Sequence, residues 1–189
     1  DRINKPEKMM IGKHITQDTA LFTGQFLLLL GSILGLVLGY FNNMLTFSYI
    51  FPLTALMLWF YATDLKKRTL VGNLLIAFLG GLLVFNEVIF DILKTLTTAE
   101  PEIQMQAVQV ILAISGFSLL LTLARELVKD LQDVEGDRQA GYKTLPITSG
   151  TVFPKLLAIL ILMVIVVFIG IIAYKTVLSR DWLSSIYMI

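Results

Sequence analysis

Long stretches without any charged side chain divide the sequence and limit what the chain can fold into. Thr19–Phe41 has no charged residue over 23 positions, and Met44–Thr63 has none over 20. Three further runs are nearly as apolar: Leu70–Phe90, Ala107–Ala124 and Val152–Tyr174. Because about 20 apolar residues in a helix cross the hydrocarbon core of a bilayer, the pattern predicts five complete transmembrane helices, with a sixth beginning at Trp182.

Helices are the elements expected for these runs. In lipid every backbone polar group must be bonded within the protein, which helices and closed barrels achieve, and each run is too long for a barrel strand. Charged residues make up 15% of the chain, against about 25% in soluble domains. We therefore expect an all-α fold, a polytopic transmembrane helical bundle that forms a single domain over residues 1–189.

Local features refine the expected spans. Asn42 and Asn43 predict a tight turn between the first two spans, and Pro52 predicts a kink in the second. Glycines recur at every fourth position of the first span, a spacing that permits close helix packing, at Gly31, Gly35 and Gly39.

Basic residues gather in the loops on one side of the expected bundle. If the spans alternate in direction, residues 1–18, 64–69 and 125–151 share one membrane face and hold 11 of the 15 Lys and Arg residues. Positively charged loops usually lie in the cytoplasm. We expect an integral protein of a prokaryotic cell inner membrane, in contact with membrane lipid, whose three charge-rich segments meet on the cytoplasmic side.

Other features exclude some classes of protein. The chain contains no Cys, which excludes disulfides and thiol chemistry, and its net charge of +1 does not suggest nucleic-acid binding. It begins on Asp1 and stops eight residues into the apolar run that starts at Trp182. We expect it to be a fragment that is incomplete at both ends.

Residues 125–143 bring many charges of both signs between two apolar runs. Asp130, Asp133 and Asp137 are spaced i, i+3, i+7, so on one helix their carboxylates would share a face. Carboxylates this close repel one another, and a cation between them relieves the repulsion. Oxygen ligands without Cys or clustered His suit Mg²⁺, which typically combines one or two carboxylates with substrate phosphates.

Cationic side chains flank the three aspartates, at Arg125, Lys129, Arg138 and Lys143. Carboxylates that hold a metal, next to cations that hold phosphate oxygens, fit a metal-bridged polyphosphate. A solvated loop whose opposite charges pair, at ~0–1 kcal/mol per pair, explains the same pattern. The spacing alone does not separate these interpretations. Likewise, the cations at 66–68, which follow Tyr61, fit either a phosphate site or a simple anchor at the membrane edge.

Three segments resemble motifs of one family. "RELVKDLQDVEGDRQAGYKTLPI" is similar to the second aspartate-rich motif of the UbiA superfamily of membrane prenyltransferases. "DRINKP" resembles the segment that closes the first aspartate-rich motif, with Asp1 as its last aspartate. "YATDLKKRTLVGN" resembles the Tyr/Lys segment between the two motifs. The resemblance covers the whole chain, which would run from just after the second helix into the eighth of the family's nine.

The resemblance implies Mg²⁺-dependent transfer of a polyprenyl group from a prenyl diphosphate to an acceptor. It implies metal ligands at Asp1, Asp130, Asp133 and Asp137. It implies catalytic roles for the last three of these and for Tyr61. It implies substrate binding by Lys66, Arg68, Asn73, Arg125, Lys129, Arg138 and Lys143. The earlier residues of the first motif are missing, so we expect residues 1–189 alone to be inactive. "EKMMIGKHI" stands where many relatives have Arg-Pro and Ser-Gly, so this segment does not identify the acceptor.

Alternatives remain for the acceptor and for the class of protein. The motifs look most like the branch that prenylates the lipid geranylgeranylglyceryl phosphate, and an aromatic acceptor of the 4-hydroxybenzoate type, used in quinone synthesis, is the alternative. A transporter or non-catalytic membrane subunit belongs to a different class and would be expected to carry charges inside its spans. The spans here are nearly free of charge, which favours an enzyme site at the membrane surface.

Overall fold

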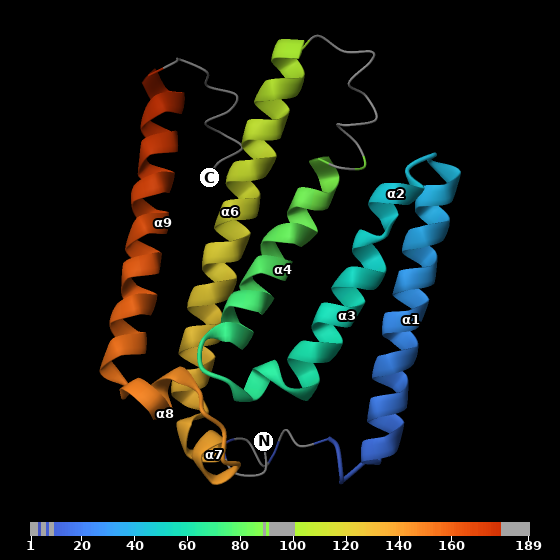
Figure 1. Ribbon diagram of the computed structural model, residues 1–189. Coiled ribbons are helices and arrows are strands. Elements are labelled where there is room, and N and C mark those ends of the chain that lie inside the picture. The colour runs from blue at the N-terminus through green and yellow to red at the C-terminus, as the bar shows by residue number, and fades with distance from the viewer. Residues whose placement is uncertain (1–3, 5–6, 8–9, 89, 91–100, 179–189) are drawn as a thin grey trace.

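The computed structural model describes residues 4, 7, 10–88, 90 and 101–178. Long helices stand side by side, and the short helices at residues 65–67, 134–139 and 145–149 lie at one end of them, whereas the short helix at residues 45–48 lies at the other (Figure 1). In chain order the elements are α1 (Gln17–Phe41), α2 (Leu45–Ser48), α3 (Ile50–Thr63), the 3-10 helix η2 (Leu65–Lys67), α4 (Val71–Glu87), α6 (Pro101–Gln132), α7 (Val134–Gln139), α8 (Leu145–Ser149) and α9 (Val152–Leu178).

The expected all-α transmembrane bundle is confirmed. In the described part of the chain, four segments are long and apolar enough to cross a membrane: Gln17–Phe41, Leu45–Thr63, Met105–Gln132 and Val152–Tyr174. The other expected span corresponds to α4, whose 17 residues rise about 26 Å at the usual 1.5 Å per residue. The sixth span expected from Trp182 lies outside the described residues. These helices make the chain an integral membrane protein.

Two of the three regularly spaced glycines bring α1 close to its neighbours. A Cβ at Gly39 would collide with Oγ of Ser48, and one at Gly35 would collide with the ring of Phe51. Gly31 differs, because a Cβ there would meet no atom within 4 Å. Close packing of α1 against α2 and α3 therefore depends on two small residues, as small-residue contacts in membranes generally do.

The break in the second span falls three residues before Pro52. Helix α2 ends at Ser48 and α3 begins at Ile50. Because proline has no N–H, Pro52 cannot donate to the carbonyl of Ser48, where a continuous helix would have its bond. The expected turn before this span is also present, since Asn43 adopts the left-handed conformation with φ 57°.

Helices α4 and α6 pack closely through a pair of glycines that the sequence analysis did not single out. A Cβ at Gly80 would lie 2.8 Å from Oγ1 of Thr122, and one at Gly81 would lie 3.0 Å from the carbonyl oxygen of Ser115. The hydroxyl of Ser118 donates to the carbonyl of Gly80 at 2.8 Å. This contact fixes α4 against the helix that leads to the aspartate segment.

Helix α6 also packs against α8 and α9. Their shared apolar core consists of Ala124, Leu127, Leu145, Ala158, Ile161 and Ile165. Helix α6 extends eight residues beyond the expected span, which ended at Ala124, so residues 125–132 are helical and not the start of a loop. The core therefore holds the polar end of α6 in place.

Candidate active site

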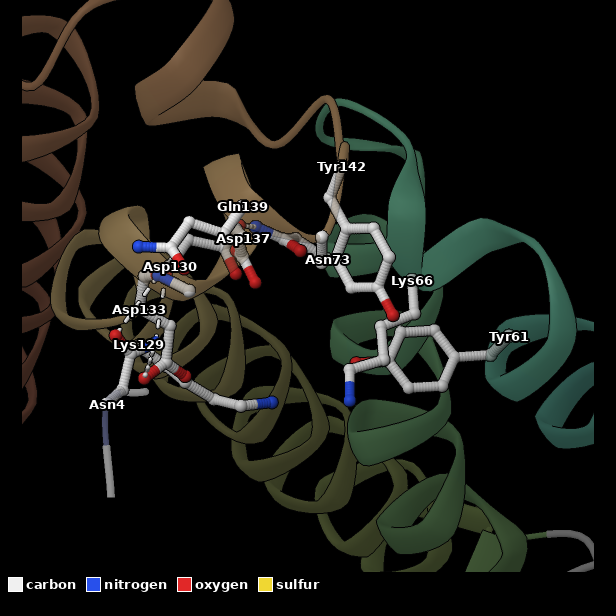
Figure 2. A pocket seen from close by; sticks show the side chains of 12 residues that line it. Asn4, Tyr61, Lys66, Asn73, Lys129, Asp130, Asp133, Asp137, Gln139 and Tyr142 are labelled. Carbon is white, nitrogen blue, oxygen red and sulfur yellow. Dashed lines mark hydrogen bonds between the residues drawn. The ribbon is translucent and has the colours of Figure 1, made fainter. Parts of the chain in front are cut away.

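A pocket of about 550 Å³ opens at the polar end of the bundle. Its lining comes from five helices and the N-terminal segment, at Asn4, Tyr61, Lys66, Asn73, Lys129, Asp130, Asp133, Gly136, Asp137, Gln139, Ala140 and Tyr142. The carboxylates and Lys129 lie on one side, with Tyr61 and Lys66 across from them (Figure 2). Segments more than 100 residues apart in the sequence thus meet around one space.

The three aspartates reach this pocket although they do not share one helix. Helix α6 ends at Gln132 and α7 begins at Val134, with Asp133 between them. The expectation of a single helical face is therefore wrong in detail. The backbone N–H of Asp137 nevertheless donates to the carbonyl of Asp133 at 2.9 Å, so the break bends the chain without unwinding it, and all three carboxylates still line the pocket.

Asp130 is held by a neighbouring helix. Nδ2 of Asn73, in the first turn of α4, donates to Oδ2 of Asp130 at 2.8 Å. Asn73 is buried, and a buried amide is stable when its hydrogen bonds are satisfied. The bond fixes the position of one carboxylate oxygen and leaves the other for a ligand.

Two lysines face the same space from opposite sides (Figure 2). Lys66 comes from η2, and Lys129 comes from the last turn of α6. Nζ of Lys129 donates to Oε2 of Glu126 at 3.1 Å. Glu126 is only 5% exposed, and a buried carboxylate needs such a partner. The pair holds one ammonium group at the pocket wall.

The loop that closes the pocket is tied to η2 by its backbone. The N–H of Lys143 donates to the carbonyl of Lys67 at 2.9 Å, and Oγ1 of Thr69 donates to the carbonyl of Lys143 at 2.6 Å. These bonds join segments 74 residues apart. Lys143 therefore contributes main-chain contacts here, and its side chain does not line the pocket.

The structure brings most of the expected site residues together but not all of them. Those at the pocket are Tyr61, Lys66, Asn73, Lys129, Asp130, Asp133 and Asp137. Arg68 pairs with Asp64 on the surface, at 2.6 Å, and Arg138 is exposed. Arg125 lines a second, mainly apolar hollow between α6 and α9, which Lys129 also lines. Asp1 lies outside the described residues.

Several lining residues were not anticipated. Asn4 and Gly136 stand within the quoted motifs, and the motif letters alone did not assign them a role. Gln139, Ala140 and Tyr142 follow the aspartates and close the pocket from the α7 side. Gln139 ends α7 and Ala140 follows it, whereas Tyr142 lies beyond the turn at Gly141, which has φ 71°.

Asp137 lies outside the membrane-spanning segments, and burial makes its carboxyl group less acidic. Burial raises the pKa of Asp137 above its ordinary value, and the neighbouring charge of Asp133 raises it further. The Thr144 hydroxyl, Lys66 and Lys129 act in the opposite direction. Burial is the largest cause and disfavours the charged carboxylate, and a divalent cation bound beside it would favour the charged form.

The residues present fit a hard divalent cation that shares its coordination with a ligand. The acidic donors are all oxygen atoms, the type that Mg²⁺ prefers. Among the described residues, no three acidic or His side chains converge closely enough to form a metal-binding group by themselves. Mg²⁺ is commonly bound through one or two carboxylates plus substrate phosphates and water. The pocket matches that arrangement better than a closed protein cage.

Comparison with protein families identifies one match over nearly the whole chain. The family model described as the UbiA prenyltransferase family matches residues 1–188. No solved structure gives a significant match.

Curated relatives point to one branch of that family. A digeranylgeranylglyceryl phosphate synthase of Methanothermobacter thermautotrophicus is 36% identical over 79% of this chain and 47% of its own length. Synthases of the same name from Methanosphaera stadtmanae and Methanobrevibacter smithii are 30% and 32% identical, over 98% and 88% of this chain and 61% and 54% of their own. The chain spans about half the length of the curated relatives that it matches.

Proposed function

The chain belongs to the UbiA prenyltransferase family, and we propose that its pocket binds an allylic prenyl diphosphate with Mg²⁺ for prenyl transfer to a lipid. The proposed donor is geranylgeranyl diphosphate, and the proposed acceptor is geranylgeranylglyceryl phosphate. The relatives are digeranylgeranylglyceryl phosphate synthases, which supports this choice, as do the motifs of the chain. The proposed enzyme is a prenyltransferase of lipid biosynthesis.

One observation carries the proposal: carboxylates and ammonium groups line a single pocket at the end of an apolar bundle. A prenyl diphosphate has the same two parts, a charged head and a long hydrocarbon tail. Burying the tail among apolar helices is favourable by ~0.8 kcal/mol per CH₂ group. A head at the pocket and a tail along the helices would match both parts of the molecule.

The pocket residues have separate proposed roles. One or two of the carboxylates of Asp130, Asp133 and Asp137 would hold each Mg²⁺, with diphosphate oxygens completing its coordination. When bound, Mg²⁺ would neutralise charge on the diphosphate and make it a better leaving group. Lys66 and Lys129 would bind diphosphate oxygens and stabilise the charge that develops on them. Asn73 would keep Asp130 in position through their hydrogen bond.

Transfer would break the bond between the allylic carbon and the diphosphate oxygen. The allylic carbon becomes cationic, and the acceptor hydroxyl forms the new C–O bond and gives up its proton, which the released diphosphate can accept. Tyr61 lies across the pocket from the carboxylates (Figure 2), and an aromatic ring can stabilise a nearby cation. The apolar surroundings would keep water from capturing the cation.

The orientation in the membrane is part of the proposal. The described charged segments lie at one end of the bundle, where η2, α7 and α8 meet (Figure 1). The concentration of Lys and Arg in the corresponding loops supports a cytoplasmic position for the pocket, in a prokaryotic cell membrane. We treat residues 1–189 as part of one transmembrane domain.

The test is an assay of the full-length protein in membranes with radiolabelled geranylgeranyl diphosphate and two acceptors. We expect Mg²⁺-dependent labelling of geranylgeranylglyceryl phosphate and none of 4-hydroxybenzoate. Labelling of the aromatic acceptor would overturn the proposed acceptor. No labelled product with either acceptor would overturn prenyl transfer itself.

A further inference from the structure

Asn4, near the start of the chain, forms hydrogen bonds with two residues at the junction of α6 and α7. Its Nδ2 donates to the carbonyl oxygen of Asp133 at 3.1 Å and to Oδ1 of the same residue at 3.3 Å. Its Oδ1 accepts from the backbone N–H of Gly136 at 3.1 Å. One carboxamide thus uses its donor and its acceptor on residues 129 and 132 positions away.

Gly136 leaves the space that this carboxamide occupies. A Cβ on Gly136 would collide with Nδ2 of Asn4 and would lie 3.0 Å from its Cγ. Gly136 does not have positive φ, so its backbone conformation does not require glycine. Glycine inside a helix costs about 1 kcal/mol relative to alanine, and the close approach of Asn4 is what the absent side chain permits.

The contacts fall where the carboxylate segment bends. Asp133 separates α6 from α7, and its side chain lines the pocket. Backbone hydrogen bonds of Asp133 with Lys129 and Asp137 continue through the break, but they do not fix the rotation of its side chain. The Asn4 amide binds both its backbone carbonyl and its Oδ1, so it restrains both the bend and the rotation of the side chain.

We propose that Asn4 is a positioning residue that locks the N-terminal segment onto the α6–α7 junction and orients the Asp133 carboxylate for cation binding. This inference rests on the proposed function of the pocket. Asn4 acts through Asp133, whereas Asp133 itself would contact the cation. We call the contact of Asn4 with Asp133 and Gly136 the lock, and Gly136 is part of it because it provides the space for Asn4.

The lock can be tested by two single variants and their combination. Asn4→Ala removes the three hydrogen bonds, and Gly136→Ala displaces Asn4 without altering any polar group. We expect either change to weaken Mn²⁺ affinity roughly tenfold, since a lost hydrogen bond to a charged group commonly has an effect of that size. The Asn4→Ala/Gly136→Ala protein should bind Mn²⁺ within about twofold of either single variant, because one contact cannot be lost twice.

The measurement uses the purified full-length protein with inorganic diphosphate and follows Mn²⁺ binding by electron paramagnetic resonance. The matched control is Gly170→Ala on α9, where a Cβ would meet no atom within 4 Å, and it should bind like wild type. Thermal unfolding separates positioning from folding, because Gly136→Ala should keep wild-type stability while it loses affinity. If Asn4→Ala fails to fold, Gly136→Ala still tests the proposal.

Wild-type Mn²⁺ affinity in Gly136→Ala would overturn the lock, and so would losses that multiply in the combined variant. Absence of Mn²⁺ binding by the wild-type protein would overturn it as well. Prenyl transfer is assayed separately on the same samples. A wild-type protein that binds Mn²⁺ with the expected non-additive pattern but transfers no prenyl group would support the lock and reject the proposed function.

Discussion

The two parts of helix α6 meet different surroundings. Ala107–Ala124 is uncharged and contacts α4 through small residues, and its outer side chains, such as Leu121 at 50% exposed, face outwards. In the following eight residues Leu127 is fully buried and Glu126 is 5% exposed. The same helix therefore changes from a part whose buried residues are small, Ser115 and Ala124, to a part that buries a leucine and a carboxylate.

The two parts of α6 differ in the interactions that fix their side chains. In the apolar part, position depends on shape, and an apolar side chain of similar volume can replace another at little cost. In the polar part specific hydrogen bonds fix charged side chains, as Glu126 fixes Lys129 and Asn73 fixes Asp130. Substitutions in the polar part should therefore affect ligand binding and turnover, whereas substitutions in the apolar part should affect stability.

The largest effect should come from the carboxylates. Changing Asp130 or Asp133 to Asn in the full-length protein should lower turnover by about a hundredfold or more, because groups that stabilise transition-state charge commonly contribute that much. The matched control is Glu135→Gln, an exposed carboxylate of α7 that does not line the pocket. The measurement is the prenyl-transfer rate of each variant at equal membrane expression. Near-wild-type rates in either aspartate variant would refute the assignment.

The next effect distinguishes two cations one turn apart on α6. Lys129→Gln should raise the KM for prenyl diphosphate about tenfold, since a charge-assisted contact is worth ~1.5–3 kcal/mol, and Lys66→Gln should do the same. Arg125→Gln should change KM less than twofold, because Arg125 does not line the pocket, whereas Lys129 lines both the pocket and the hollow facing α9. Steady-state kinetics with varied prenyl diphosphate measure this. Equal increases for Lys129→Gln and Arg125→Gln would contradict the placement of the site.

A substitution in the apolar body should act on stability alone. A Cβ at Gly39 would collide with Ser48 and would lie 3.2 Å from the carbonyl oxygen of Met44. Gly39→Ala should lower the free energy of unfolding by ~1–3 kcal/mol, as overpacking usually does. Gly31→Ala is the control, because nothing lies within 4 Å of its Cβ position. Thermal unfolding in detergent compares the two, and equal stability would argue against close packing at Gly39.

The smallest effect concerns pH. Burial raises the pKa of Asp137, so this group contributes stability below the ordinary aspartate value of about 4 and loses it as pH rises through the raised pKa. Metal-free Asp137→Asn should therefore be slightly more stable than wild type at neutral pH, with the difference vanishing towards pH 4. Melting curves from pH 4 to 7 test this. An Asp137→Asn protein that is less stable than wild type at neutral pH would contradict the predicted sign of the stability difference.

Much of the fold was readable from the sequence because lipid imposes a simple rule. Runs without charge had to be helices, and Pro52 marked the break between α2 and α3. The contacts between helices were less readable. Gly80 and Gly81 pack against α6, yet nothing in their spacing distinguishes them from other membrane glycines.

The candidate site was predictable in its chemistry but not in its geometry. Asp130, Asp133 and Asp137 could be grouped by spacing, and Asn73 and Tyr61 by resemblance. The direction of Arg125 depends on how α6 is rotated against α9, which local sequence does not specify. Asn4 was missed for a similar reason, since its partners are 129 and 132 positions away and only the folded chain brings them together.

The central claim is that this pocket binds a prenyl diphosphate through a divalent cation. The most direct measurement is equilibrium binding of radiolabelled geranylgeranyl diphosphate to the full-length protein, with Mg²⁺ and with EDTA. We predict Mg²⁺-dependent binding that persists in Glu135→Gln and is lost in the Asp130→Asn/Asp133→Asn protein. Binding of equal strength in EDTA, or in the protein lacking both aspartates, would contradict the account.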